Sequence, residues 1–241
     1  MDPMNTYTKL INKHKGETAI IFGAGPSLYE FYQRKLYDKV KDNVLISVNS
    51  SIIIMPWDEK GDKNKYFWMS CDHLCTRWNY FPKILISNCT KVVRNSWEKY
   101  KDKLTDFLYF KPRPTSEGII NKENLGLCYS SSSVAAADMA LQMGCSNIFL
   151  LGFDQCQDGK TGYHHFWQFL KNPPVAHPPA MGSWKSQTKV FEYNNMAYEA
   201  LKGFAEYKSC KIYNVSLIST VTAFDKISYD EFEKYLEKNK K

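Results

Sequence analysis

Short runs of apolar residues recur along the chain and predict the strands of a buried sheet. The clearest runs are TAIIF (18–22), NVLISV (43–48) and NIFLL (147–151), rich in branched residues and ended by turn-forming residues. A fourth run, KYFWMS, covers 65–70, and weaker candidates cover 84–87, 91–94 and 211–215. Because these runs are apolar throughout rather than alternating, they indicate a sheet that is covered on both faces.

Amphipathic segments lie between the apolar runs and predict helices. They cover 27–40, 131–144 and 187–209, and the second of them has serines at its start and a glycine at its end. Strand, turn, helix and strand in succession are typical of a parallel sheet with crossover helices. We therefore expect an α/β fold of the Rossmann-like, doubly wound type, with a mainly parallel sheet and helices on both faces.

One segment departs from this pattern. Residues 172–179 read NPPVAHPP, which has too many prolines for a helix or a central strand. We expect 1–241 to form a single domain, with one irregular insertion at about 155–186 that serves as a lid or an interface arm. Apart from the weak strand candidates at 84–87 and 91–94, we assign no role to residues 74–125.

Composition and charge narrow the class of protein. The chain has 241 residues, is 44% hydrophobic and carries a formal charge of +7, which favours an anionic ligand or an ordinary basic surface. No stripe of Lys and Arg alternates with aromatic residues, so we do not expect nucleic-acid binding. The chain shows neither a signal peptide nor the ~20 apolar residues of a membrane span, so we expect a cytoplasmic protein. Seven scattered cysteines without a CxxC pair indicate buried free thiols.

The turn after the first predicted strand, GAGPSL, is a candidate anion site. Gly23 and Gly25 allow a sharp turn and a close approach of backbone to ligand, and Pro26 suits the first turn of a helix. Ser27 adds a hydroxyl donor, and the free amides of a helix start favour phosphate or carboxylate. A simple glycine turn is the alternative. Leu28 stands where a dinucleotide-binding motif has its third glycine, and no P-loop lysine follows.

Other predicted strands also end in small or polar residues, and the helix predicted over 131–144 begins with three serines. The group consists of Asn49, Asp72, Ser131, Ser132, Ser133, Gly152 and Asp154. Each also has an ordinary structural role as a turn former or a helix cap. Because the carboxyl ends of parallel strands meet at one edge of a sheet, we expect these residues to form a ligand site with the glycine turn.

These motifs together resemble the MptE-like domain family, named for an archaeal 6-hydroxymethyl-dihydropterin pyrophosphokinase and including motility accessory factors and phage proteins. The resemblance rests on GAGPSL, ISVNSS, the SCDH strand end, SSSVAAADMALQMGCSNIFLLGFD and NVSLIST. It covers about 18–73 and 126–165, with a weaker match at 211–224. More distantly, the chain is similar to bacterial single-domain sialyltransferases, which share the Gly-x-Gly-Pro-Ser-Leu turn and the Gly-x-Asp strand end.

The two resemblances imply different ligands. The sialyltransferase likeness implies a cytidine nucleotide in contact with Gly25, Ser27, Asn49, Ser132, Gly152 and Asp154. The pyrophosphokinase likeness implies a nucleoside triphosphate and Mg²⁺ held by Asp72 and Asp154, although the Gly-Asp expected after the histidines is missing. In both cases the ligand is a nucleotide or a nucleotide-sugar, and the identity of any metal stays open.

Two adjacent histidines in DGKTGYHHFW, His164 and His165, follow the third clear strand and are candidates for a general base. Neighbouring residues of an extended loop point to opposite sides, so we expect one of them to face the site, with a slight preference for His164. His177 lies further along the insertion, and Asp72 is a further candidate base. The aromatic residues of the insertion stack on a base or sugar, pack the loop, or form a homo-oligomer contact; they are Tyr163, Phe166, Trp167 and Trp184.

These observations favour a transferase that binds a nucleotide or nucleotide-sugar, with glycosyltransferase chemistry of the sialyltransferase kind. The alternatives are Mg²⁺-dependent pyrophosphoryl transfer from ATP and a nucleotide-binding protein without catalytic activity. The sequence does not identify the donor nucleotide or the acceptor.

Overall fold

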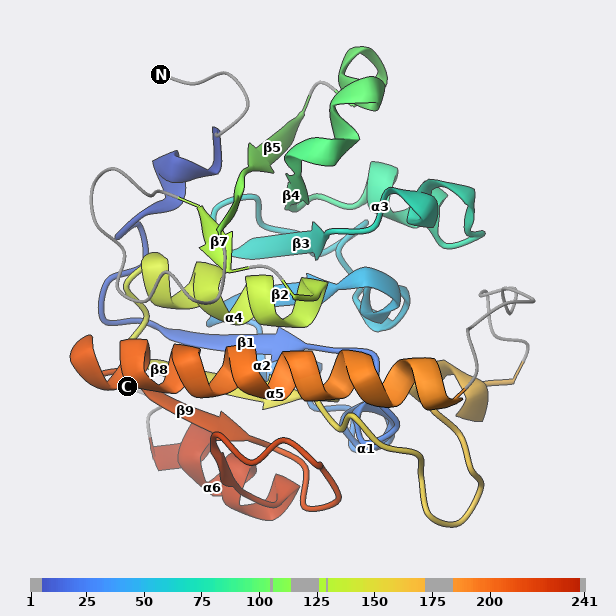
Figure 1. The fold of residues 1–241 in the computed structure, drawn as a ribbon, viewed down its shortest axis with the longest axis vertical. Helices are drawn as coiled ribbons and strands as arrows, with labels where there is room; N and C mark the ends of the chain where they lie inside the picture. The colour runs from blue at the N-terminus through green and yellow to red at the C-terminus, as the bar shows by residue number, and fades with distance from the viewer. Residues whose placement is uncertain (1–5, 105, 114–125, 129, 172–183, 239–241) are drawn as a thin grey trace.

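The computed structural model describes residues 6–104, 106–113, 126–128, 130–171 and 184–238. Its centre is an eight-stranded parallel sheet with the order β10-β9-β8-β1-β2-β3-β4-β5 (Figure 1). The strands are β1 (Thr18–Phe22), β2 (Val44–Val48), β3 (Tyr66–Ser70), β4 (Thr90–Arg94), β5 (Phe107–Phe110), β8 (Asn147–Leu151), β9 (Lys211–Asn214) and β10 (Asp225–Lys226). A separate parallel pair joins β6 (Pro112–Arg113) to β7 (Leu127–Cys128). The predicted doubly wound α/β fold is confirmed.

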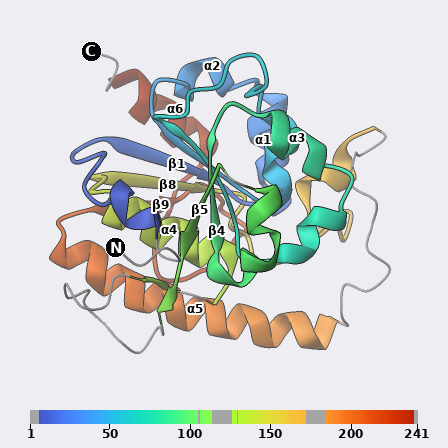
Figure 2. The same cartoon turned by 90° about the horizontal axis from the view of Figure 1, so that it is seen from above.

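Helices cover both faces of the sheet. The α-helices are α1 (Leu28–Gln33), α2 (Tyr37–Val40), α3 (Phe81–Ile86), α4 (Ser132–Gln142), α5 (Trp184–Tyr207) and α6 (Tyr229–Lys238). The 3₁₀ helices include η1 (Thr6–Leu10), η2 (Asn49–Ile54), η3 (His73–Arg77), η4 (Asn95–Lys103) and η6 (Phe166–Phe169). Seen from above, α4 and α5 lie on one side of the sheet, and α1, α2, α3 and α6 lie on the other (Figure 2).

Each face of the sheet has its own hydrophobic core, because successive side chains of a strand point to opposite faces. In β1, for example, Ala19 and Ile21 pack in the core under α4 and α5, whereas Ile20 and Phe22 pack in the core under α1 and α6. The central strands β2 and β3 are buried at every position. This is the reason that their sequences are continuously apolar.

The predicted strands at 18–22, 43–48, 65–70, 91–94, 147–151 and 211–215 are confirmed to within a residue. The prediction of a strand at 84–87 is wrong, because these residues end α3, which has a proline in its first turn. Leu85 and Ile86 of that run are exposed, so its apolar character does not reflect burial on two faces. Strand β5, at the edge of the sheet, was not predicted, since its four residues carry no clear turn signal.

The predicted helices are confirmed with one interruption. Helix α4 begins at the N-cap Ser131 and is followed by Gly144 in the left-handed region (φ 84°). The helix predicted over 27–40 is divided into α1 and α2, because Lys35 has φ 53° and turns the chain so that Leu36 enters the core. Helix α5 begins at Trp184, inside the predicted insertion, and the proline-rich stretch 172–179 and His177 lie outside the described residues.

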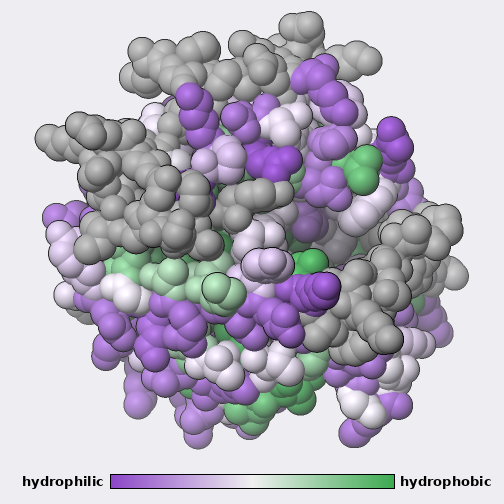
Figure 3. All heavy atoms as spheres, in the orientation of Figure 1, coloured by the Kyte–Doolittle hydropathy of each residue, from purple (hydrophilic) through white to green (hydrophobic). Residues whose placement is uncertain are grey.

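The coloured residues of the face shown in Figure 3 are mainly hydrophilic, with hydrophobic areas on the left and near the lower end. Helix α5 nevertheless exposes Val190, Tyr193 and Met196, which lie three residues apart. That spacing places them on one side of the helix. The homo-oligomer expected from the aromatic residues stays a prediction.

Candidate functional site

The sheet reverses its winding direction between β1 and β8. From β1 the chain proceeds through β2, β3 and β4 to β5 at one edge, whereas β8, β9 and β10 continue to the other edge. The connections that leave the carboxyl ends of β1 and β8 therefore lead to opposite edges of the sheet. In open α/β sheets this is the position where a crevice forms and ligands bind.

The turn after β1 and the loop after β8 are in direct contact. Gly25 N donates a hydrogen bond to Gly152 O at 2.9 Å. A Cβ atom at Gly25 would lie 2.3 Å from Asp154 Oδ2 and 2.7 Å from Gly152 O. Any side chain at position 25 would thus displace the loop, so the glycine is required for the two strand ends to meet.

Asp154 connects this turn to a third segment. Its Oδ2 accepts a hydrogen bond from Ser27 N at 2.8 Å, and its Oδ1 accepts one from the Ser216 hydroxyl. The side chain is almost fully buried, and this burial raises its pKa, opposed by the hydrogen bonds from Ser216 and Ser27. The amide of Ser27, which precedes the six-residue helix α1, therefore has an internal carboxylate as its acceptor.

A cavity of about 480 Å³ opens beside these strand ends. Its walls come from the ends of β1, β2 and β8, the start of α4, the loop that carries His164 and His165, and α5. The sequence-predicted residues among its lining are Gly25, Asn49, Ser131, Ser133, Gly152, Asp154, His164 and His165. These residues come from five separate parts of the chain, and the fold brings them to one site.

Five predicted site residues lie outside the lining of this cavity. Pro26 and Ser27 line a second cavity of about 470 Å³ between α1 and the segment after β9, and Gly23 N donates to Leu151 O within the sheet. The Ser132 hydroxyl accepts a hydrogen bond from Cys71 N at 2.8 Å and so connects α4 to the end of β3.

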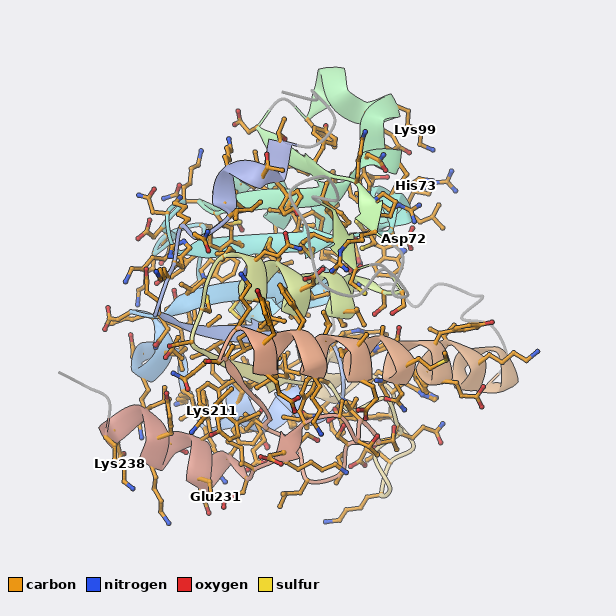
Figure 4. All side chains as sticks on the ribbon, turned by 60° about the vertical axis from the view of Figure 1, so that its left-hand side comes forward. Asp72, His73, Lys99, Lys211, Glu231 and Lys238 are labelled. Carbon is orange, nitrogen blue, oxygen red and sulfur yellow. The ribbon has the colours of Figure 1, made fainter. Side chains whose placement is uncertain are left out.

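Asp72 occupies a capping position. Its Oδ1 accepts a hydrogen bond from Leu74 N at 2.8 Å at the start of η3. Figure 4 shows Asp72 beside His73, with Lys99 close by at the same end of the sheet. Asp72 does not line the cavity that contains His164 and His165.

Asn49 lies at the carboxyl end of β2 in an unusual backbone conformation. Its φ is 52°, in the left-handed region that asparagine tolerates better than most residues. Its carbonyl oxygen accepts a hydrogen bond from Trp68 Nε1 at 3.0 Å, which fixes the backbone. Its Oδ1 is buried without a hydrogen-bond partner among the described residues. The side chain thus leaves hydrogen-bonding capacity for a ligand in the cavity.

The start of α4 presents two serines to the cavity. Ser131 is the N-cap, and its hydroxyl accepts a hydrogen bond from Val134 N at 3.3 Å. The hydroxyl of Ser133 is hydrogen-bonded to the side chain of Tyr198 on α5. The cavity wall therefore joins α4 to α5 through side chains as well as through apolar packing.

Both histidines line the cavity, but their surroundings differ. His165 Nδ1 is 3.3 Å from Ala24 O, and because a carbonyl only accepts, Nδ1 carries the hydrogen. In neutral His165, Nε2 is then the basic nitrogen. The His165 ring stacks on Trp167 at a centroid distance of 5.2 Å. His164 Nε2 instead lies 2.8 Å from the Gln157 side-chain amide. The side-chain oxygen of Gln168 accepts from both histidine backbone amides.

Helix α5 supplies cavity residues that the sequence did not reveal as functional. They include Phe191, Asn194 and Tyr198, which recur at three- and four-residue spacing and so share one side of the helix. This spacing is also that of an ordinary buried helix face. The only additional signal was Asn194, a polar residue within an apolar stripe.

The described residues do not form an evident metal site. No group of three or more His, Cys, Asp or Glu side chains within that part of the chain could hold a metal ion. Asp72 caps η3, and both carboxylate oxygens of Asp154 accept hydrogen bonds from protein donors. The pair implied by the pyrophosphokinase likeness does not fit a shared Mg²⁺.

Comparisons with known proteins were made for sequence and for structure. No protein-family model and no curated protein matches the sequence. Among solved structures, the MAf glycosyltransferase from Magnetospirillum magneticum AMB-1 is similar over 93% of this chain, with a TM-score of 0.55 and 14% identity. This chain spans 38% of that protein. A second solved structure is the sialyltransferase CstII from Campylobacter jejuni in complex with a substrate analogue, cytidine-5'-monophosphate. The match covers 89% of this chain and 86% of the CstII chain, with a TM-score of 0.46 and 15% identity.

These structural neighbours are glycosyltransferases. At such low identity, the first match establishes a common fold and leaves the chemistry to be argued from the site. Among the described residues, no helix is both long enough and apolar enough to cross a membrane.

Proposed function

We propose that this protein is a glycosyltransferase that binds a nucleotide-sugar in the cavity between β1 and β8. The observation that carries the proposal is the convergence of eight sequence-predicted residues on that one cavity, at the position where the sheet reverses direction. The common fold with a glycosyltransferase supplies a structural precedent for this chemistry.

The polar groups of the cavity favour a donor with a single phosphate. Among the described lining residues there is no Lys or Arg, and Asp154 is the only carboxylate. A di- or triphosphate needs cations to balance its charge, whereas one phosphate needs only hydroxyl and amide donors. The hydroxyls of Ser131 and Ser133 are suitable donors for the phosphate, and Oδ1 of Asn49 is a suitable acceptor for a ribose hydroxyl. A cytidine monophosphate-sugar, as implied by the resemblance of the motifs, meets this requirement.

His165 is the better candidate for the general base. Its Nδ1–H donates to Ala24 O, which holds Nε2 in the form that accepts a proton. In the proposed reaction, Nε2 takes the proton of the acceptor hydroxyl, and the hydroxyl oxygen forms a bond to the anomeric carbon of the sugar. The bond between that carbon and the phosphate oxygen breaks, and its electron pair leaves with the nucleotide. The proton thus ends on His165, and the negative charge of the broken bond ends on the nucleotide phosphate.

A thermal-shift experiment with cytidine monophosphate (CMP), a CMP-sugar, a UDP-sugar and ATP, each with and without Mg²⁺, tests this function. We expect CMP and the CMP-sugar each to raise the melting temperature of the protein. The size of each shift should be the same with and without Mg²⁺. At a hundredfold excess over Kd, binding contributes about 2.7 kcal/mol, which corresponds to roughly 5–10 °C for a chain of this size.

The other functions give different results in the same experiment. A shift with ATP only in the presence of Mg²⁺ would favour pyrophosphoryl transfer. A shift with CMP-sugar, but no release of CMP from it during incubation with acceptor mixtures, would favour a non-catalytic binding protein. The absence of any shift would contradict a nucleotide site in this cavity.

A further inference from the structure

Asn194 presents a hydrogen-bond donor to the cavity. The residue lies on α5, is only 6% exposed and forms part of the cavity wall. Its Oδ1 accepts a hydrogen bond from the Ser130 hydroxyl at 2.9 Å. That contact occupies the oxygen of the amide and sets its orientation, so the Nδ2 group is the part that remains to bind a ligand.

Gln155, on the loop after β8, also forms part of the cavity wall and has an unpaired acceptor. Its Nε2 donates to Asn195 Oδ1 at 3.3 Å, whereas its Oε1 is buried without a partner among the described residues. The residue has φ 51°, a conformation that costs energy for any residue with a side chain. A buried acceptor without a donor is also unfavourable. Residues that carry such costs are frequent at binding sites.

The two amides are connected through α5. Gln155 is anchored by Asn195, the residue that follows Asn194 on the helix, and both Gln155 and Asn194 line the same cavity. Because each amide has one end bound to the protein, neither can rotate by 180° without losing its anchor. The cavity wall therefore contains two amides of fixed orientation, one with its oxygen occupied and the other with its nitrogen occupied.

We propose that Asn194 and Gln155 read the hydrogen-bonding edge of the nucleobase and distinguish amino from keto pyrimidines. Cytosine carries an amino donor at the ring position where uracil carries a carbonyl acceptor. A fixed donor and acceptor pair can match only one of these two patterns in a given pose, and the other pattern leaves buried polar groups unpaired. This inference rests on the proposed function, since it assigns the base specificity of the same cavity.

Calorimetric titration of the full chain with CMP, uridine monophosphate (UMP) and ribose 5-phosphate tests the inference. We expect the affinities of the unaltered protein for CMP and UMP to differ by about tenfold or more, the effect of one unpaired buried group. In Asn194→Ala the difference between CMP and UMP should narrow to within about threefold, while ribose 5-phosphate, which has no base, binds as before. Gln155→Met keeps the side-chain length but removes the acceptor. It should also narrow the difference between the CMP and UMP affinities. Glu192→Ala, at an exposed position of α5 outside the cavity lining, is the matched control and should change nothing.

The outcomes separate this inference from the proposed function. If the unaltered protein binds CMP and UMP equally, or if Asn194→Ala and Gln155→Met keep the original ratio, base reading by this pair is wrong and the nucleotide site stands. Equal weakening of all three probes in both variants, with unchanged melting temperatures, would assign the two residues a structural role and also overturn the inference. If none of the probes binds to the unaltered protein, both proposals are wrong.

Discussion

His165 lies in the cavity wall, and its contact with the turn after β1 favours one of its two tautomers. It lines the cavity, stacks on Trp167 and donates from Nδ1 to Ala24 O. His164, which the sequence slightly favoured, is bound through Nε2 to Gln157. The sequence could place the pair beside the site, but it could not tell which ring is oriented by the turn after β1, because that contact joins residues 141 positions apart.

The variant His165→Asn separates the two ring nitrogens. The asparagine amide can still donate to Ala24 O but has no counterpart of Nε2. We expect the turnover rate for sugar transfer to fall by about a hundredfold or more, the usual contribution of a general base, with little change in CMP affinity. His164→Asn is the matched control and should have the smaller effect. If the turnover rate falls further in His164→Asn than in His165→Asn, His164 and not His165 is the general base.

Asp154 gives the site a pH-dependent stability. Burial raises the pKa of its carboxyl group in the folded protein, whereas in the unfolded chain it titrates near 3.9. Between these two values the folded state binds the proton and the unfolded state does not. The contribution of Asp154 to the free energy of unfolding therefore falls as pH rises through this window.

Asp154→Asn should remove that dependence. The asparagine can accept from Ser27 N and donate to the Ser216 hydroxyl, so both contacts of the carboxylate are retained in form. We expect the stability of the variant relative to the unaltered protein to increase from pH 4 upward and then level off. Urea unfolding at a series of pH values measures this, and a difference that does not vary with pH would contradict the account.

At the scale of elements, a buried ion pair joins the small β6–β7 pair to α4. Arg113 Nη2 lies 2.9 Å from Asp138 Oδ2, with both side chains at most 3% exposed. Asp138 also accepts from Cys128 N and from Gln142 Nε2. Tyr7 from η1 donates to Gln142 Oε1 at 2.6 Å and extends the network. Burial raises the pKa of Asp138, and Arg113 opposes this shift.

Removal of one member of this pair should be costly. Arg113→Met leaves the Asp138 carboxylate buried without its cation, and we expect a loss of about 3–5 kcal/mol in the free energy of unfolding. Arg34→Met is the control, because Arg34 bridges α1 and α6 through ion pairs at the surface. Its loss should cost less than about 1 kcal/mol. Urea unfolding measures both variants. Equal losses in the free energy of unfolding would show that the buried network stabilises the protein no more than the surface ion pairs do.

The elements were predictable where local signals agree with burial. Strands β1, β2 and β8 are apolar because they are covered on both faces, and α4 has both its caps in the sequence. The break at Lys35 and the helical state of 84–86 depend on tertiary packing, which a local pattern does not contain. Helix α5 was predicted, but its part in the cavity wall was not, because a cavity wall and a buried helix face have the same residue spacing.

At the scale of the molecule, the order of the strands creates the site. The glycine turn, Asn49 and the end of β8 were predictable as a group, because parallel strands carry their carboxyl ends to one edge. Their division into lining and supporting residues was not predictable. Ser27 and Ser132 bond to Asp154 and Cys71 inside the protein, whereas their neighbours Gly25, Ser131 and Ser133 line the cavity.

The most direct test of this account is a crystal structure of the protein grown with CMP. We predict electron density for the nucleotide in the cavity between β1 and β8, with polar contacts to Asn49 and Ser133 and with Nε2 of His165 facing the phosphate side. Nucleotide density at the second cavity between α1 and the segment after β9, or an empty first cavity at saturating CMP, would contradict it.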